Sequence, residues 1–202
     1  AFSNGIGGIA AQTAFLALAD LLHRRANLEH AAADLANVFQ STMLMLLMGL
    51  PLLAWITPPV TVLAVHPVSV AIVALYAGGV VASHRLRQRP MWTPVQTAET
   101  DPDQPDEPAA NDGATWALGL RFAALMLLLA GAGIVIAKSA GLLTDRLGLS
   151  ASIVGALATA VVTSLPELVT TLAAVRRRAL QLAVGGIIGG NTFDMLFLTL
   201  SD

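Results

Sequence analysis

Residues 35–83 contain no aspartate, glutamate, lysine or arginine, and this uncharged run limits the folds available to the chain. The hydrocarbon core of a bilayer is about 30 Å thick, so a helix that crosses it needs roughly 20 apolar residues. The run is long enough for two such helices. Pro58 and Pro59 lie near its middle and supply a break, because proline cannot continue a helix. The sequence therefore predicts an all-α integral membrane protein.

The composition of the whole chain supports a membrane environment. Hydrophobic residues make up 55% of the sequence and charged residues 12%, about half of the charged fraction of a soluble domain. A net charge of -2 provides no basic surface for nucleic acid, which we do not expect as a partner. The absence of cysteine excludes disulfides and thiolate metal sites. The lipid bilayer is the partner that the composition predicts.

Six apolar segments divide the chain into two membrane halves. The polar stretch 84–115 is acidic and rich in proline around residues 101–108, which predicts a disordered linker. Residues 1–83 then hold three helices and residues 116–202 hold three more. The chain begins and ends within helical pattern, so we expect the remaining helices of a longer membrane protein as further partners. The predicted spans are residues 2–22, 32–56, 60–83, 116–143, 150–175, and 180 onward.

The basic residues predict how these spans are oriented. With six alternating crossings, nine of the eleven lysines and arginines fall on one side, and only Lys138 and Arg146 fall on the other. Positive residues favour the cytoplasmic side, so we expect the loops 23–31, 84–115 and 176–179 to be cytoplasmic. The expected location is the cell (inner) membrane, with multiple passes. The nine residues are Arg24, Arg25, Arg85, Arg87, Arg89, Arg121, Arg176, Arg177 and Arg178.

An internal repeat relates the first segment to the last. At a shift of 182 positions, residues 3–20 align with residues 185–202, and seven of these eighteen positions are identical. The two copies are five crossings apart, so they run in opposite directions. Inverted repeats are typical of transporters, whose substrate site lies near the midplane where the repeats meet. Internal similarity without transport is the alternative.

Glu167 and Asp194 are the strongest candidates for a functional site. Each is a carboxylate within an apolar span, and an ionisable residue at membrane depth costs about 2.5 kcal/mol or more. Two such residues on consecutive spans indicate a cation held midway across the bilayer.

Neutral oxygen atoms accompany both carboxylates. Thr163 and Ser164 lie four and three residues before Glu167, and Asn191 lies three before Asp194, so each group shares a helix face. Pro166 should break its helix and free carbonyl oxygens around residues 160–163. Hard cations such as calcium prefer this all-oxygen set. Alternatively, the hydroxyls bond back to the helix and the proline only kinks it.

The same motifs resemble a known family. Thr163-Ser-Leu-Pro-Glu167, followed by Gly189-Gly-Asn-Thr-Phe-Asp194, resembles the second alpha-repeat of sodium/calcium exchangers in the cation/calcium antiporter superfamily. Residues 3–20 are similar to the back half of the first alpha-repeat. The resemblance implies a polytopic helical transporter in which two inverted halves form a central ion cluster. It implies no enzyme activity, and no nucleophile–base set accompanies the carboxylates.

The resemblance also implies roles for individual residues. Glu167 would be a principal carboxylate ligand, Asp194 would be the acidic group on the next helix, and Thr163 and Ser164 would belong to sodium sites. Gln12 falls where the family has asparagine in the first repeat. The implied function is antiport of calcium, or a similar cation, against sodium or protons by alternating access. We expect no cofactor, and the bound species would be inorganic cations.

Several positions depart from the family pattern. Gly8 and Gly190 stand where the family has serine, Ile9 stands where asparagine is expected, and Val162 replaces glycine. Side-chain oxygens are therefore lost in both repeats, which affects sodium coupling more than cation binding. A membrane module that binds or senses cations without transporting them is the alternative function.

Overall fold

The computed structural model describes residues 2–24, 27–56, 61, 65–95, 97–98 and 115–199. Within these ranges, six helical segments are long and apolar enough to cross a membrane, as predicted. The chain is a multi-pass helical membrane protein. The crossings are α1 (Phe2–Leu22), α3 (Leu35–Ile56), α4 (Pro67–Gln88), α5 (Thr115–Leu147), the composite segment Ala151–Arg176 and α9 (Leu180–Thr199), with a short α2 (Leu28–Ala31) after α1.

The fifth crossing is divided into four pieces. It starts with α6 (Ala151–Ile153), widens into the π-helix η1 (Val154–Thr159), and continues as α7 (Ala160–Thr163) and α8 (Leu165–Arg176). Gly148 has a positive φ of 63°, which glycine adopts without strain, and it ends α5 just before this crossing begins.

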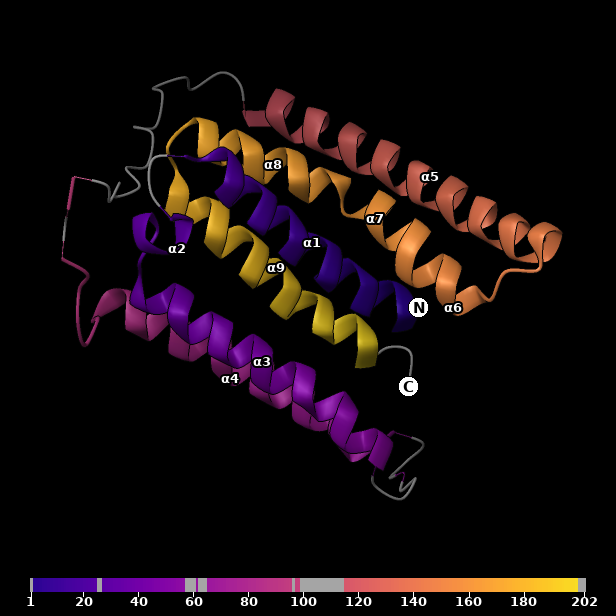
Figure 1. Ribbon diagram of the computed structural model, residues 1–202, viewed down its shortest axis with the longest axis horizontal. Coiled ribbons are helices and arrows are strands. Elements are labelled where there is room, and N and C mark those ends of the chain that lie inside the picture. Colours follow the sequence, from indigo (N-terminus) through magenta and orange to yellow (C-terminus); the bar gives the residue numbers. More distant parts are fainter. Residues whose placement is uncertain are drawn as a thin grey trace.

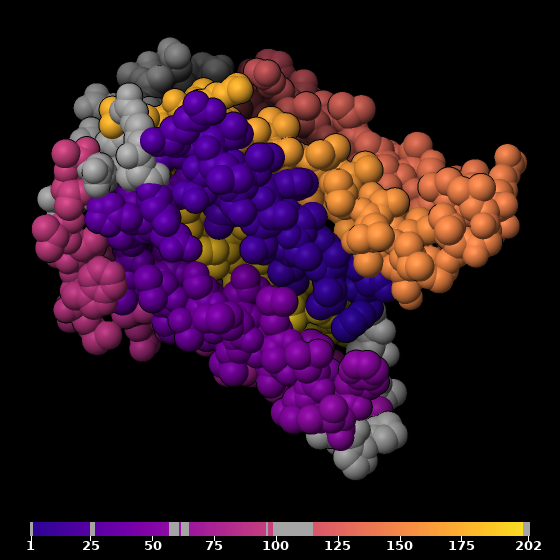
Figure 2. All heavy atoms as spheres, viewed as in Figure 1, coloured from indigo at the N-terminus to yellow at the C-terminus, as the bar shows by residue number. Residues whose placement is uncertain are grey.

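Helix α9 lies at the centre of the bundle and packs against α1, α3, α4 and α8 (Figure 1). Figure 2 shows its yellow atoms between the indigo atoms of α1 and the purple atoms of α3. Helices α1 and α9 run antiparallel, so the start of α1 and the end of α9 lie together (Figure 1). The two copies of the sequence repeat therefore have opposite directions.

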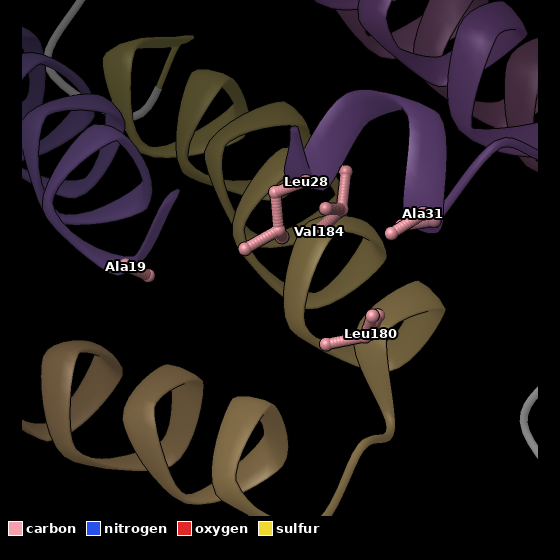
Figure 3. Packing of buried hydrophobic residues seen from close by; sticks show 6 residues of the cluster. Ala19, Leu28, Ala31, Leu180 and Val184 are labelled. Carbon is pink, nitrogen blue, oxygen red and sulfur yellow. The ribbon is translucent and has the colours of Figure 1, made fainter. Parts of the chain in front are cut away.

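Two apolar clusters fix α9 within the bundle. One joins the end of α1 and the start of α9 through α2 (Figure 3). There Asp20 Oδ1 accepts a hydrogen bond from the Leu28 backbone N–H at 2.6 Å, which attaches α2 to α1. The other cluster joins α1, α3, α4 and α9. The buried members are Ala19, Leu28, Ala31, Ala32, Leu180 and Val184 in the first, and Ile9, Leu47, Ile72, Met195 and Leu198 in the second.

The third crossing is displaced along the sequence from its predicted position. Helix α4 begins at Pro67, because His66 Nδ1 caps it by accepting a hydrogen bond from Val68 N–H at 3.2 Å. It then continues through Arg85 and Arg87 to Gln88, past the predicted boundary at residue 83. The acidic part of the predicted linker, residues 101–108, lies outside the described residues. The predicted disorder there stays a prediction.

Helix α5 lies at the edge of the bundle, where its described contacts are with α6 and η1 (Figure 1). None of its residues is buried in the described structure. The less exposed positions are Ile136, Ala140 and Thr144, which are spaced four residues apart along one stripe.

Candidate cation site

A cavity of about 390 Å³ lies between α1, the α7–α8 break and α9. Carboxylates, amides and hydroxyls from three crossings line it, together with the apolar residues Phe197 and Leu198. The lining residues are Asn4, Gly5, Gly8, Gln12, Thr163, Ser164, Glu167, Asp194, Phe197 and Leu198.

The break between α7 and α8 places the hydroxyl of Ser164 and the carboxylate of Glu167 at this cavity. Only Ser164 separates the two helices, and Pro166 lies in the first turn of α8. The Ser164 N–H donates to the carbonyl oxygens of Ala160 at 3.1 Å and Val161 at 3.2 Å. The prediction of free carbonyls at these two positions is therefore wrong, because the last turn of α7 tightens and satisfies them.

Thr163 also differs from expectation. It lines the cavity, but its Oγ1 donates to the carbonyl oxygen of Thr159 at 2.8 Å and to that of Ala160 at 3.3 Å. The Thr163 hydroxyl therefore bonds back to carbonyl oxygens of its own helix, which was the alternative reading of the hydroxyls in the sequence. The oxygen keeps its lone pairs, so it can still accept a hydrogen bond or coordinate a cation.

Gln12 and Asp194 are in direct contact across the two repeats. Gln12 Nε2 donates a hydrogen bond to Asp194 Oδ2 at 3.3 Å, and the residues are separated by 182 positions. That separation equals the shift between the sequence repeats, so equivalent positions of α1 and α9 meet here. The meeting place of the inverted repeats is thus the wall of this cavity.

Acceptor oxygens with no partner gather around the cavity. Glu167 Oε2, Gln12 Oε1 and Asn4 Oδ1 are fully buried, and none has a hydrogen-bond partner within the described part of the chain. Leaving such an atom unpaired costs about 1–3 kcal/mol. All three atoms are acceptors, and a bound cation or its water would satisfy them.

Five of the six residues predicted for the site line this cavity: Gln12, Thr163, Ser164, Glu167 and Asp194. Asn191, the sixth, is only 1% exposed and is absent from the lining. Its Oδ1 is likewise buried and has no partner among the described residues. The two carboxylates are not joined by a third: no group of three or more His, Cys, Asp or Glu able to hold a metal occurs in the described ranges.

Asn4 is a lining residue that the sequence reasoning missed. It lies eight residues before Gln12, with Gly8 midway, so the three share one face of α1. Two polar residues eight positions apart within an apolar span are the signal that identifies this face.

The two glycines that replace family serines also lie at the site. A Cβ added at Gly8 would lie 3.6 Å from Ser164 Oγ, and one added at Gly190 would lie 3.8 Å from Gln12 Oε1. Both distances are ordinary van der Waals contacts. A Cβ would therefore fit at either position.

Comparison with known protein families gives a match over the second half of the chain. The family model described as sodium/calcium exchanger protein matches residues 116–199, which include α5, the broken crossing and α9. No curated protein and no solved structure matches the chain.

Proposed function

Because residues 116–199 belong to the sodium/calcium exchanger family, we propose that this chain forms part of a secondary active antiporter. The transported species would be calcium, or a similar hard cation, in exchange for sodium or protons. The family places the chain among cation exchange transporters in general. The choice of ions, the site residues and the alternating-access mechanism are parts of the proposal.

The observation that carries the proposal is the meeting of two carboxylates and unpartnered oxygens between antiparallel repeats. Glu167 and Asp194 line one cavity, and the buried Oε2 of Glu167 has no hydrogen-bond partner among the described residues. Two carboxylates in an apolar bundle repel each other and are poorly solvated, and a divalent cation relieves both costs. Amide and hydroxyl oxygens from Gln12, Thr163 and Ser164 would complete an all-oxygen coordination shell.

The arrangement of the helices supports the proposed mechanism. Each repeat supplies one side of the cavity, so a rocking motion of one repeat against the other would expose the ions to one membrane face at a time. The π-helix η1 and the break at Ser164 are irregular segments beside the cavity, where the backbone can adjust. Moving the two carboxylates between the membrane faces without a bound cation would be costly, because their charges would be unpaired. The site therefore changes sides only with an ion bound, and this couples the outward movement of one ion to the inward movement of another.

The basic residues support an orientation. The ends of α1, α4 and α8 lie at one end of the bundle (Figure 1). Arg24 follows α1, Arg85 and Arg87 lie in the last turn of α4, and Arg176 lies in the last turn of α8. We assign this end to the cytoplasm of the cell (inner) membrane by the positive-inside rule.

The test uses the full-length protein in sealed vesicles. Calcium uptake is measured against an outward sodium gradient and, separately, against a proton gradient. Glu167→Gln removes one charge at nearly constant volume and should reduce uptake to background. Glu29→Gln alters an exposed carboxylate on α2 and serves as the matched control, with uptake unchanged. Full uptake by Glu167→Gln would rule out the proposed site.

The loss of oxygens at Gly8 and Gly190 favours a second candidate, a module that binds cations without transporting them. It predicts that calcium raises the thermal stability of the protein while no gradient drives uptake. Measured exchange would exclude this candidate. If the protein shows neither stabilisation by calcium nor uptake, both functions fail.

A further inference from the structure

Asn4 is a residue of the cavity lining with an unsatisfied side-chain oxygen. Its Oδ1 is fully buried and has no hydrogen-bond partner within the ranges that the structure describes. Asn4 lies eight residues before Gln12 on α1, which corresponds to about 12 Å along the helix axis. Asn4 and Gln12, the residue that contacts Asp194, therefore lie at different levels along α1.

The cavity lining also includes the residue of α1 midway between these two levels. Gly8 lies midway on the same face of α1, and Ser164 Oγ lies opposite it. The polar lining therefore follows α1 from Gln12 through Gly8 to Asn4. This direction leads away from the end of α1 that carries Arg24 (Figure 1).

The backbone around Asn4 is closely packed against η1 and α9. A Cβ added at Gly155 of η1 would lie 3.6 Å from the backbone nitrogen of Asn4. A Cβ added at the neighbouring Gly5 would lie only 2.7 Å from Leu198 Cδ2. An amide oxygen that stays unpaired in such a place is unfavourable unless a ligand or water reaches it.

We propose that Asn4 forms an outer cation position, distinct from the Glu167–Asp194 position. A hard cation that enters from the side opposite the basic loops would exchange part of its hydration shell for the Asn4 oxygen. It would then pass Gly8 and Ser164 to reach the carboxylates. A neutral amide suits this step because it binds a cation weakly enough to release it. The inference rests on the proposed transport function.

The outer position is tested by comparing calcium transport from the two faces of the membrane. Full-length protein is reconstituted in vesicles, and the KM for calcium is measured separately from each face. Asn4→Ala should raise the KM about tenfold from the face opposite the basic loops, with the KM from the basic face and the maximal rate unchanged. Asn4→Asp should lower the KM from that same face. Gln88→Ala, which removes an exposed amide at the basic end, is the control and should alter neither KM.

Two outcomes would overturn the outer position. An unchanged KM from both faces in Asn4→Ala would show that the oxygen is not a ligand. An equal rise from both faces would assign Asn4 to the central site or to a structural role. If the unmodified protein transports no calcium, the proposed transport function fails, but the outer position can still be tested. The test is then equilibrium binding of calcium to the protein in detergent. Asn4→Asp should then strengthen binding in a Glu167→Gln background, and no change would refute the proposal.

Discussion

Gln12 and Asp194 occupy the same position in the two inverted repeats, and they are hydrogen bonded to each other at 3.3 Å. A pseudo-twofold axis that relates α1 to α9 must therefore pass close to this bond. The two residues differ chemically, since one is a neutral amide and the other a carboxylate. The site is consequently symmetric in its backbone and asymmetric in its charge.

Replacing Gln12 with leucine should weaken cation binding about tenfold. The substitution removes the donor that holds Asp194 Oδ2 and a buried acceptor oxygen, while the side-chain volume changes little. A tenfold change corresponds to about 1.4 kcal/mol, which is within the range for a hydrogen bond to a charged group. Calcium binding to the detergent-solubilised protein measures the effect. Affinity equal to that of the unmodified protein would show that the contact has no role in the site.

Gly7→Ala should destabilise the protein. A Cβ at position 7 would collide with the backbone carbonyl of Ala156 in η1, which cannot move aside as a side chain can. Overpacking of this kind costs about 1–3 kcal/mol, so we expect the thermal midpoint in detergent to fall by roughly 5 °C. Gly133→Ala on α5 is the matched control, because no described atom lies within 4 Å of its added Cβ. Equal midpoints for the two variants would contradict the close approach of α1 and η1.

Gly8→Ser should strengthen binding of sodium. The added Cβ would lie 3.6 Å from Ser164 Oγ, an ordinary contact, and the hydroxyl that it carries would add one neutral oxygen at the site. We expect an increase in sodium affinity of up to about tenfold, measured as displacement of calcium by sodium. Gly186→Ser adds the same group to α9 in a place with no described atom within 4 Å, and should have no effect. Weaker sodium binding in Gly8→Ser would contradict the placement of position 8 in the cation site.

Single cysteines can test the orientation of the bundle, because the native chain contains none. Leu149→Cys lies between α5 and α6, and Gln88→Cys ends α4 at the basic end. A maleimide that cannot cross membranes should label Leu149→Cys in intact cells and Gln88→Cys only after the cells are opened. The reverse pattern would invert the assigned orientation.

The six crossings could be predicted from the sequence because hydrophobic length is a local property. The predicted bounds of α1, α3, α5 and the composite crossing agree with the structure to within a few residues at each end. The start of α4 could not be predicted, because the apolar composition of residues 60–66 resembles that of a membrane span. The helix there is set by His66 and Pro67, whose capping geometry depends on the position of a single side chain.

Part of the site could be predicted because the residue types of a single apolar span are also a local property of the sequence. Carboxylates within apolar spans identify Glu167 and Asp194 directly, whereas the contact between Gln12 and Asp194 depends on how distant helices pack. Asn191 shares a helix with Asp194 but is absent from the cavity lining. The π-helix was not foreseen either, since an extra residue in one turn leaves no pattern in residue type.

That π-helix determines how the chain can be compared with its relatives. A wide turn in η1 holds one residue more than an α-turn, and Thr159 Oγ1 accordingly reaches both Gly155 O at 2.8 Å and Val154 O at 3.3 Å. Deleting one residue there would restore a regular α-helix and preserve the facing of Ser164 and Glu167. A regular helix of unchanged length would instead turn both side chains by about 100° relative to α6. An alignment that places a gap within residues 154–159 therefore keeps the cation site intact.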